Sequence, residues 1–342
     1  MTSLSITPKF NTKNLLEILI KNNSDQIISS FKVCFSLVYS IKSLEGAQIN
    51  KQTGRYYELR TDDPHLPANG SLIITLALQI PRIGTYNMSC GPEGIFVIDK
   101  NNKIIQSSID KLTFETEISK VIYPTKKENT SMPVIPEPKI RKMKNDFINC
   151  NNSFHIIDQK LLEIVNVLKR SCQKLQIDFN SKQGRQIHYK EAKLESEEYK
   201  IEILKDKIII TAFDYSGRLY ALISLIHLIF CYRNKLPLGL IQDKPQFYWR
   251  GMHLDCARQF HSVNQIKRLL DYMVFFKLNR FHWHLTDNEA WRLDLKSFPS
   301  LAKQTSFRGY HEIIPPVYGT GYHRSGGYYS STDVKEIIKY AK

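Results

Sequence analysis

The sequence is poor in cysteine and has no cysteine pair at the spacing of a metal site. It contains six: Cys34, Cys90, Cys150, Cys172, Cys231 and Cys256. No two of them form a CxxC motif, and their spacing suggests neither a zinc site nor a disulfide framework. Most lie in apolar runs, as Cys34 does between Val33 and Phe35. We therefore expect buried, reduced thiols.

The sequence also lacks an obvious export or membrane segment. Residues Met1–Ser5 do not begin a basic segment followed by an apolar stretch, so no signal peptide is visible. The longest apolar stretch, Leu219–Cys231, is too short for a membrane span and is interrupted by Ser224 and His227. These absences predict a cytoplasmic protein without a membrane partner.

Acidic residues are few relative to basic ones. The chain has 48 Lys and Arg against 33 Asp and Glu, which gives a net charge of +15 and a pI of about 9.4. A nucleic-acid surface needs basic residues gathered on one face among aromatics. Here they are scattered, and the densest run, Lys139–Lys144, lies in a proline-rich segment. We expect a solvated Lys-rich surface and no nucleic-acid partner, with a nucleic-acid-binding protein as the alternative.

Hydrophobic residues make up 42% of the chain, which is enough for several folded cores. Residues 1–122 predict a β-sandwich, because short apolar runs alternate with turn residues. The expected strands are Leu15–Ile20, Phe31–Ile41, Arg55–Arg60, Leu72–Ile80 and a hairpin from Ile95 to Ile104. This segment shows no catalytic constellation. A carbohydrate-binding module and a structural appendage are both compatible with it.

Residues 123–144 are rich in proline and charge, and predict a linker. Residues 145–244 then predict an α+β domain, with a helix within Ile156–Leu175 and a second, mostly apolar helix at Arg218–Cys231. The expected strands are Gln186–Tyr189, Tyr199–Leu204 and Lys207–Phe213. No polar residues are seen to converge in this domain, so a supporting role is expected.

Residues 245–342 alternate between strand and helix patterns. The expected elements are a buried strand Phe247–Asp255, a helix capped by Ser262, a strand Leu278–Leu285 and a helix from Thr332. This order is typical of βα repeats in a parallel sheet or barrel, where polar residues just after the strands line the active site. Asp255, Arg258 and Asp287 are such residues.

Four runs in this segment carry a resemblance to a known family: Trp249–Phe260, Lys277–Asn279, Phe281–Asp287 and Trp291–Arg292. They resemble the opening of the catalytic barrel of family 20 glycoside hydrolases, the β-N-acetylhexosaminidases. The preceding segment is similar to the family's companion domain through Glu198–Ile201 and Ser216–Leu222. The resemblance implies a multidomain chain with an N-terminal β-sandwich, an α+β companion domain and the first two βα units of a (β/α)₈ TIM barrel.

The resemblance also implies a reaction. Enzymes of this family release terminal N-acetylglucosamine or N-acetylgalactosamine with retention, using the substrate's own acetamido oxygen as nucleophile. A Glu protonates the leaving oxygen, and a neighbouring Asp orients the acetamido group. That pair lies in a His-x-Gly-Gly-Asp-Glu-like motif, which this sequence does not contain. We therefore expect a hexosaminidase fragment, interrupted by a premature stop, a frameshift or fragmentation, that is inactive alone. The alternative is a non-catalytic sugar-binding or assembly module.

Two functional positions carry over by resemblance. Arg258 matches the arginine that binds hydroxyls of the terminal sugar, and Asp287 matches the carboxylate that supports the catalytic acid through a later histidine, also missing here. The family prefers Ser-Arg-His at Ala257–Gln259 and Asp-Asp-Gln at Asp287–Glu289, so the rim of the pocket departs from its pattern. Without these roles, Arg258 would simply pair with Asp255, and Asp287 would cap a helix or a turn after the strand.

Other candidate groups are expected to be structural. His282 and His284 share a strand face, a spacing that can bind metal, but no third ligand is evident, so core packing is expected. Asp287 and Glu289 lie in one short loop and are not expected to be the catalytic pair. We expect no metal and no cofactor. The expected partner is an oligosaccharide or glycoconjugate containing N-acetylhexosamine, and the oligomeric state is left open.

Overall fold

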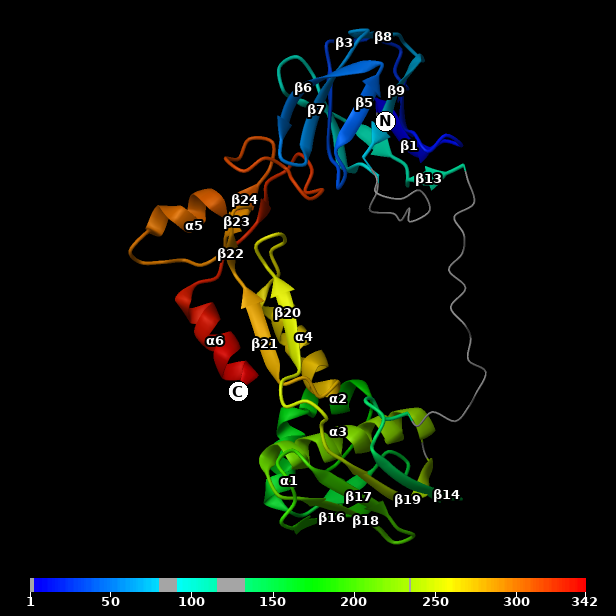
Figure 1. Cartoon of the computed structure of the whole chain (residues 1–342), viewed down its shortest axis with the longest axis vertical. Helices are drawn as coiled ribbons and strands as arrows, with labels where there is room; N and C mark the ends of the chain where they lie inside the picture. Colours follow the sequence, from blue (N-terminus) through cyan, green and yellow to red (C-terminus); the bar gives the residue numbers. More distant parts are fainter. Residues whose placement is uncertain (1–2, 80–90, 116–132, 234) are drawn as a thin grey trace. The chain divides into compact units, whose positions relative to one another are not determined.

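The computed structural model describes residues 3–79, 91–115, 133–233 and 235–342. The chain forms two compact units, each assembled from segments that are separate in the sequence (Figure 1). Unit 1 comprises Met1–Pro124, Asp255–His261 and His284–Glu336. Unit 2 comprises Thr125–Leu254, Ser262–Trp283 and Ile337–Lys342.

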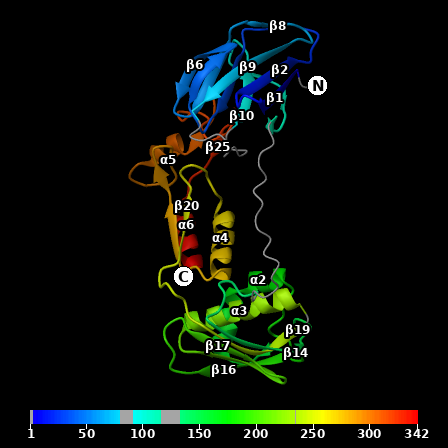
Figure 2. The same cartoon turned by 45° about the vertical axis from the view of Figure 1, so that its right-hand side comes forward.

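The N-terminal part of unit 1 consists of two facing sheets (Figure 2). The first has the order β12-β1-β2-β9-β5, with β13 also paired to β1: Ser107–Ile109, Leu4–Phe10, Leu16–Asn22, Ser71–Leu78, Ile41–Glu45 and Thr113–Phe114. The second has the order β11-β10-β4-β7-β6: Ile104–Ile105, Glu93–Ile98, Lys32–Ser36, Tyr56–Thr61 and Ala47–Thr53. A short pair joins β3 (Ile28–Ser29) and β8 (His65–Leu66). Alternate residues of β1 and β2 are buried in the shared core, as the period of a strand requires.

The predicted strands of this sandwich occur, with two differences. The hairpin from Ile95 to Ile104 is confirmed, because β10 and β11 pair with Ile98 opposite Ile104. The predicted strand Phe31–Ile41 is two strands, since β4 belongs to the second sheet and β5 to the first. Other strands were not predicted, among them β1, which pairs along its whole length with β2, and β6, which pairs with β7. Ile80 and Cys90 lie outside the described residues.

Unit 2 contains a sheet with helices on one face (Figures 1 and 2). Its strand order is β14-β19-β17-β18-β16-β15: Ile140–Asn149, Lys235–Asp243, Tyr199–Ile203, Lys207–Ala212, Arg185–Glu191 and Phe154–Ile156. The helices are α1 (Gln159–Val167), α2 (Lys169–Lys174) and α3 (Tyr215–Tyr232). Residues 140–144, expected in the linker, already belong to β14, and residues 116–132 are outside the described part.

The helix α3 is the apolar centre of unit 2. By length and mean hydropathy (1.2) it could cross a membrane, but 61% of that window is buried inside the protein. It packs on β17 and β18, and the Asp214 carboxylate caps its start by accepting a hydrogen bond from Gly217 N at 2.7 Å. A capped helix packed on a sheet is typical of the core helix of a folded domain.

Strands β20 (Gly251–Asp255) and β21 (Arg280–His284) form a two-stranded sheet joined by α4 (Val263–Phe275). They run parallel, because Arg250 O accepts from Asn279 N (2.9 Å) where they begin, and Cys256 N donates to His284 O (2.9 Å) where they end. Ser262 caps α4 as predicted, in a capping box with Gln265.

The strand predicted to be buried at Phe247–Asp255 is shorter and more open than expected. β20 begins at Gly251, and Tyr248 before it is 84% exposed. Met252 within the strand is 38% exposed. The physical reason is that a two-stranded sheet covers only one edge of each strand and leaves much of its faces to solvent.

After β21 the chain forms short paired strands and two helices. β22 (Thr286–Asp287) pairs with β23 (Ala290–Trp291), and β24 (Phe307–Arg308) pairs with β25 (Ser325–Gly326). The helices are α5 (Pro299–Thr305) and α6 (Ser331–Ala341), the second of which was predicted to open at Thr332.

Candidate active site

Arg258 and Asp287, expected to meet where two strands end, are in contact in unit 1. Arg258 follows β20, Asp287 ends β22, and Arg258 Nη1 donates to Asp287 Oδ2 at 2.5 Å. Both side chains are partly exposed, at 36% and 28%. The parallel direction of the strands is what brings these two loops to the same end of the sheet.

Arg258 is held by three carboxylates. Besides Asp287, Asp255 Oδ2 lies 3.1 Å from Nη1, and Glu289 Oε2 lies 3.3 Å from Nε. None of these contacts uses Nη2. Loss of solvent lowers the pKa of Arg258, but the hydrogen bonds with Asp287 and Tyr318 and the charges of Asp255 and Glu289 outweigh it, so its pKa is raised. Arg258 therefore pairs with Asp255 and also faces the other carboxylates.

Asp287 is held in its ionised form. Its Oδ1 accepts from Asn288 N at 2.6 Å, and its Oδ2 lies 3.1 Å from His284 Nε2. The hydrogen bonds from Asn288, His284 and Arg258 lower the pKa of Asp287 to about 2. Asp287 makes both the turn contact with Asn288 and the contact with Arg258. The carboxylate therefore stabilises the loop and also places a negative charge in the site.

Two buried arginines support the loop that carries Arg258. Arg292 donates from Nε to Cys256 O (2.9 Å) and from Nη2 to Ala257 O (3.2 Å). Arg308 donates from Nη2 to Ala257 O (2.7 Å) and from Nη1 to Arg258 O. Burial lowers the pKa of Arg292 to about 10, with a further contribution from the charge of Arg308. Both guanidinium groups fix the backbone on which Arg258 stands.

Most of this support was not predicted from the sequence. Arg292 lies in one of the runs that resemble the family, but no role was assigned to it. No sequence pattern pointed to Arg308, since its partners lie about 50 residues earlier. Tyr318 was also missed. Its hydroxyl donates to Glu289 Oε1 at 3.0 Å, and its ring faces the Arg308 guanidinium at 5.2 Å.

The expectation for the strand histidines needs correction. His282 was expected in the core but is exposed, because no described strand covers that face of β21. Within unit 2 its ring lies 4.7 Å from that of His253, an imidazole that was not among the predicted candidates. His284 contacts Asp287 and Arg258 instead of packing in a core.

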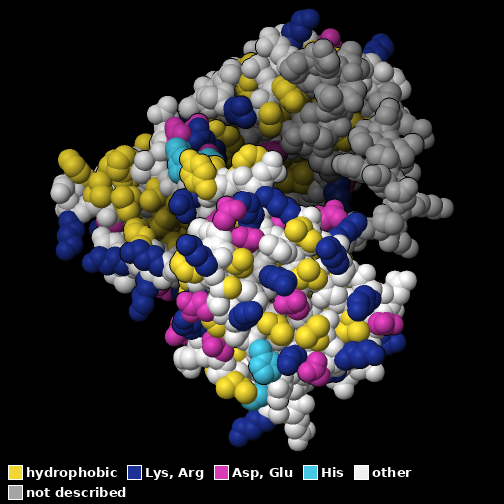
Figure 3. Space-filling model, turned by 60° about the horizontal axis from the view of Figure 1, so that its bottom comes forward, with side chains coloured by type: hydrophobic (Ala, Val, Ile, Leu, Met, Phe, Trp, Pro, Cys, Tyr) yellow, Lys and Arg dark blue, Asp and Glu magenta, His cyan; other side chains and the backbone are white. Residues whose placement is uncertain are grey.

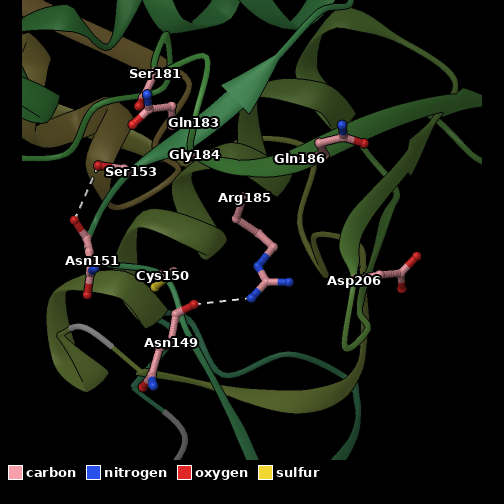
Figure 4. A pocket seen from close by; sticks show the side chains of 10 residues that line it. All are labelled: Asn149, Cys150, Asn151, Ser153, Ser181, Gln183, Gly184, Arg185, Gln186 and Asp206. Atoms are coloured by element: carbon pink, nitrogen blue, oxygen red, sulfur yellow. Dashed lines mark hydrogen bonds between the residues drawn. The ribbon is translucent and has the colours of Figure 1, made fainter.

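The companion segment does gather polar side chains, contrary to expectation. A cavity of about 670 Å³ in unit 2 is lined by residues of three segments, within 149–153, within 181–186 and at Asp206 (Figure 4). Arg185 stands in it and donates to Lys205 O (2.6 Å) and Asn149 O (3.2 Å). The three segments are distant in sequence, and the parallel pairing of β15 with β16, and of β16 with β18, brings them together.

The family model and the curated relatives that match this chain all point to the same family. The model of the glycosyl hydrolase family 20 catalytic domain matches residues 247–342. A beta-hexosaminidase of Vibrio furnissii is 37% identical over 145 residues, which cover 42% of this chain and 24% of that protein. An N,N'-diacetylchitobiase of Vibrio harveyi is 38% identical over 152 residues, 42% of this chain and 17% of that protein.

Solved structures extend the similarity beyond residues 247–342. The GH20 exo-β-N-acetylglucosaminidase from Vibrio harveyi, solved in complex with N-acetylglucosamine, aligns with a TM-score of 0.78 and 25% identity over 99% of this chain and 55% of that one. A β-N-acetylhexosaminidase from Bacteroides fragilis aligns with a TM-score of 0.51 and 26% identity over 61% of this chain and 43% of that one. The chain thus spans about half of the first structure and a quarter or less of the two curated relatives. By these similarities residues 247–342 resemble the catalytic domain of glycosyl hydrolase family 20, and the chain as a whole resembles the fold of a solved family 20 enzyme.

Proposed function

We propose that residues 247–342 form the first two βα units of a hexosaminidase TIM barrel, and that the Arg258 site binds a terminal N-acetylhexosamine. The parallel strands β20 and β21 with α4 between them support the barrel assignment. The single observation that carries the sugar site is Arg258, held among Asp255, Asp287 and Glu289 where the two strands end. The names of the relatives point to the same sugar class.

Each side chain has a definite part in this proposal. The guanidinium of Arg258 donates to paired sugar hydroxyls, a geometry that a planar fork suits. Its three carboxylates keep it oriented and charged before a ligand arrives. Asp287 stays ionised at neutral pH because its pKa is about 2, and it can therefore anchor an imidazole that supports a catalytic acid.

The chemical step needs groups that these 342 residues do not contain. Substrate-assisted retaining hydrolysis uses an acid Glu beside an Asp that orients the acetamido group, and no His-x-Gly-Gly-Asp-Glu-like motif is present in the sequence. We therefore infer that the 342-residue polypeptide binds the sugar without hydrolysing it. It has the binding part of the site and lacks the acid.

Two measurements test the two halves of the proposal. In the first, the purified polypeptide is incubated with a chromogenic N-acetylglucosaminide, and we expect no release of chromophore above buffer. Hydrolysis at a rate typical of the family would contradict the inferred lack of an acid.

The second measurement is the affinity for N-acetylglucosamine, followed by ligand-observed NMR. Arg258→Ala removes the charged donor, so we expect at least about tenfold weaker binding. Arg268→Ala, at an exposed position of α4, is the matched control and should bind like the parent. Equal affinity of the Arg258 and Arg268 variants would reject Arg258 as the sugar-binding residue.

A further inference from the structure

The sandwich in unit 1 packs against a loop of the sugar site. This loop, residues 309–324, joins β24 to β25 and is called the β24–β25 loop. The ring of Phe96 in β10 meets Tyr310 and Tyr322 edge-on, with centroids 5.9 and 5.5 Å apart, while the two tyrosines stack on each other at 5.6 Å. Cys34, Tyr56 and Ile98 complete this apolar cluster on the sandwich side.

Polar contacts fix the same loop. Ser36 Oγ, in β4, donates to Pro316 O at 2.7 Å and is buried. The Tyr310 hydroxyl donates to Asn102 Oδ1 at 2.9 Å in the β10–β11 turn. Contacts of this kind, between residues more than 200 positions apart, define one orientation of the loop on the sandwich.

The backbones approach each other so closely that only glycine fits on each side. A Cβ on Gly94 would lie 2.6 Å from Gly319 O, and a Cβ on Gly319 would lie 2.8 Å from Glu93 Cβ. Both glycines also have positive φ, +59° and +70°.

Tyr318 is the residue that the loop presents to the site. It has φ +57°, a left-handed conformation that a bulky side chain adopts only where its surroundings impose it. Its ring faces Arg55 of the sandwich at 5.9 Å and Arg308 at 5.2 Å. Its hydroxyl bonds Glu289, whose other oxygen lies 3.3 Å from Arg258 Nε.

The described residues of the sandwich offer few exposed rings on which a sugar could stack. Platforms for sugars are usually exposed aromatic rings, since their apolar faces match the C–H faces of a pyranose. In the described residues 3–79 and 91–115, the large apolar side chains that are exposed are all isoleucines: Ile27, Ile49, Ile73, Ile104 and Ile109. The rings of Tyr56 and Phe96 are covered by the loop instead.

We propose that the N-terminal sandwich is a scaffold for the sugar site: it holds the β24–β25 loop so that the Tyr318 hydroxyl orients Glu289 and, through it, Arg258. Tyr318 and Glu289 are positioning residues in this scheme. The role of Tyr318 in sugar affinity rests on the proposed function of Arg258, whereas the docking of the loop does not.

The docking is tested by hydrogen exchange of the whole chain, read by mass spectrometry over residues 309–324. Gly94→Ala drives a Cβ into the loop backbone, so exchange there should become at least about tenfold faster. Gly54→Ala is the matched control, because Gly54 has φ +57° in the same sandwich and nothing within 4 Å of its Cβ position. Equal exchange of the loop in the two variants would overturn the scaffold.

A second pair of variants avoids backbone strain. Arg55→Ala removes the cation over the Tyr318 ring and should speed exchange in the loop, while Arg60→Ala, exposed on β7 of the same sheet, should not. A loop that exchanges alike in both variants would count against the part assigned to Arg55.

The positioning role has its own readout. Tyr318→Phe keeps the ring and removes the hydroxyl, so loop exchange should stay as in the parent while affinity for N-acetylglucosamine falls about fivefold. Unchanged affinity would contradict the role of Tyr318. If the parent chain fails to bind this sugar, the proposed function is wrong. Hydrogen exchange in the Gly94→Ala and Gly54→Ala variants would still test whether the sandwich holds the loop.

Discussion

At the scale of single residues, Asp287 is a carboxylate whose ionised form is stabilised by its neighbours. The hydrogen bonds from Asn288, His284 and Arg258 lower its pKa to about 2, against an ordinary value of 3.8. Between these two pH values the carboxylate of Asp287 is mostly protonated in the unfolded chain and mostly ionised in the folded chain. The contribution of Asp287 to stability is therefore complete above about pH 4 and is lost as the pH falls towards 2.

This difference predicts a pH-dependent gap between the parent chain and Asp287→Asn. The melting temperature of the parent should fall more steeply than that of the variant between pH 4 and 2, since only the parent has this carboxylate to protonate. Calorimetric scans at several pH values measure both slopes. Parallel curves over this window would mean that the site does not hold the charge of Asp287.

The contact between Arg258 and Asp287 is the part of the site that the sequence predicted. Arg258 and Asp287 follow the ends of neighbouring strands, so parallel pairing alone predicts that they meet. Arg308 and Tyr318 had no comparable signal. Their partners are backbone carbonyls and a carboxylate in other loops, and no local pattern in a sequence encodes such contacts.

At the scale of elements, the sequence predicted the features that depend on hydrogen bonds between residues close in the chain. The cap at Ser262 and the turn at Asp99–Asn102 were both found, because each depends on hydrogen bonds within a few residues. The split of Phe31–Ile41 into β4 and β5 was not, because the apolar pattern continues while the chain changes sheets. Exposure of β20 was also missed, since burial depends on what covers a strand.

The capping box of α4 gives a prediction at this scale. Ser262→Ala removes the acceptor for Gln265 N and should lower the free energy of unfolding by about 1 kcal/mol. Urea unfolding followed by far-UV circular dichroism measures the loss. Asn264→Ala, exposed in the first turn of the same helix, should cost less than about 0.5 kcal/mol. An equal cost for both would show that the cap contributes nothing.

At the scale of the whole molecule, the charge of +15 is spread out. On the face in Figure 3, Lys and Arg side chains alternate with Asp, Glu and apolar ones and form no continuous basic stripe. Many basic residues are already paired, as Lys9 is with Glu17 and Glu115. From this face we expect weak attraction of polyanions, because few phosphates could be neutralised together.

Titration with a labelled DNA duplex over a range of salt concentrations tests this. The logarithm of the binding constant should fall against the logarithm of salt with a slope no steeper than about −3. A slope near −6 or steeper would favour the alternative of a nucleic-acid-binding protein. The same titration with a labelled neutral dextran gives the background signal.

The packing of Phe96 and Asn102 on Tyr310 also has a consequence for synthesis on the ribosome. Asn102 precedes Tyr310 by 208 residues, and translation at 5–20 residues per second takes roughly 10–40 s to cover that distance. For that time we expect the rings of Tyr56 and Phe96 in the nascent sandwich to lack the cover that the later loop provides. A chaperone that shields this face until the later loop emerges would raise the yield of correctly folded polypeptide.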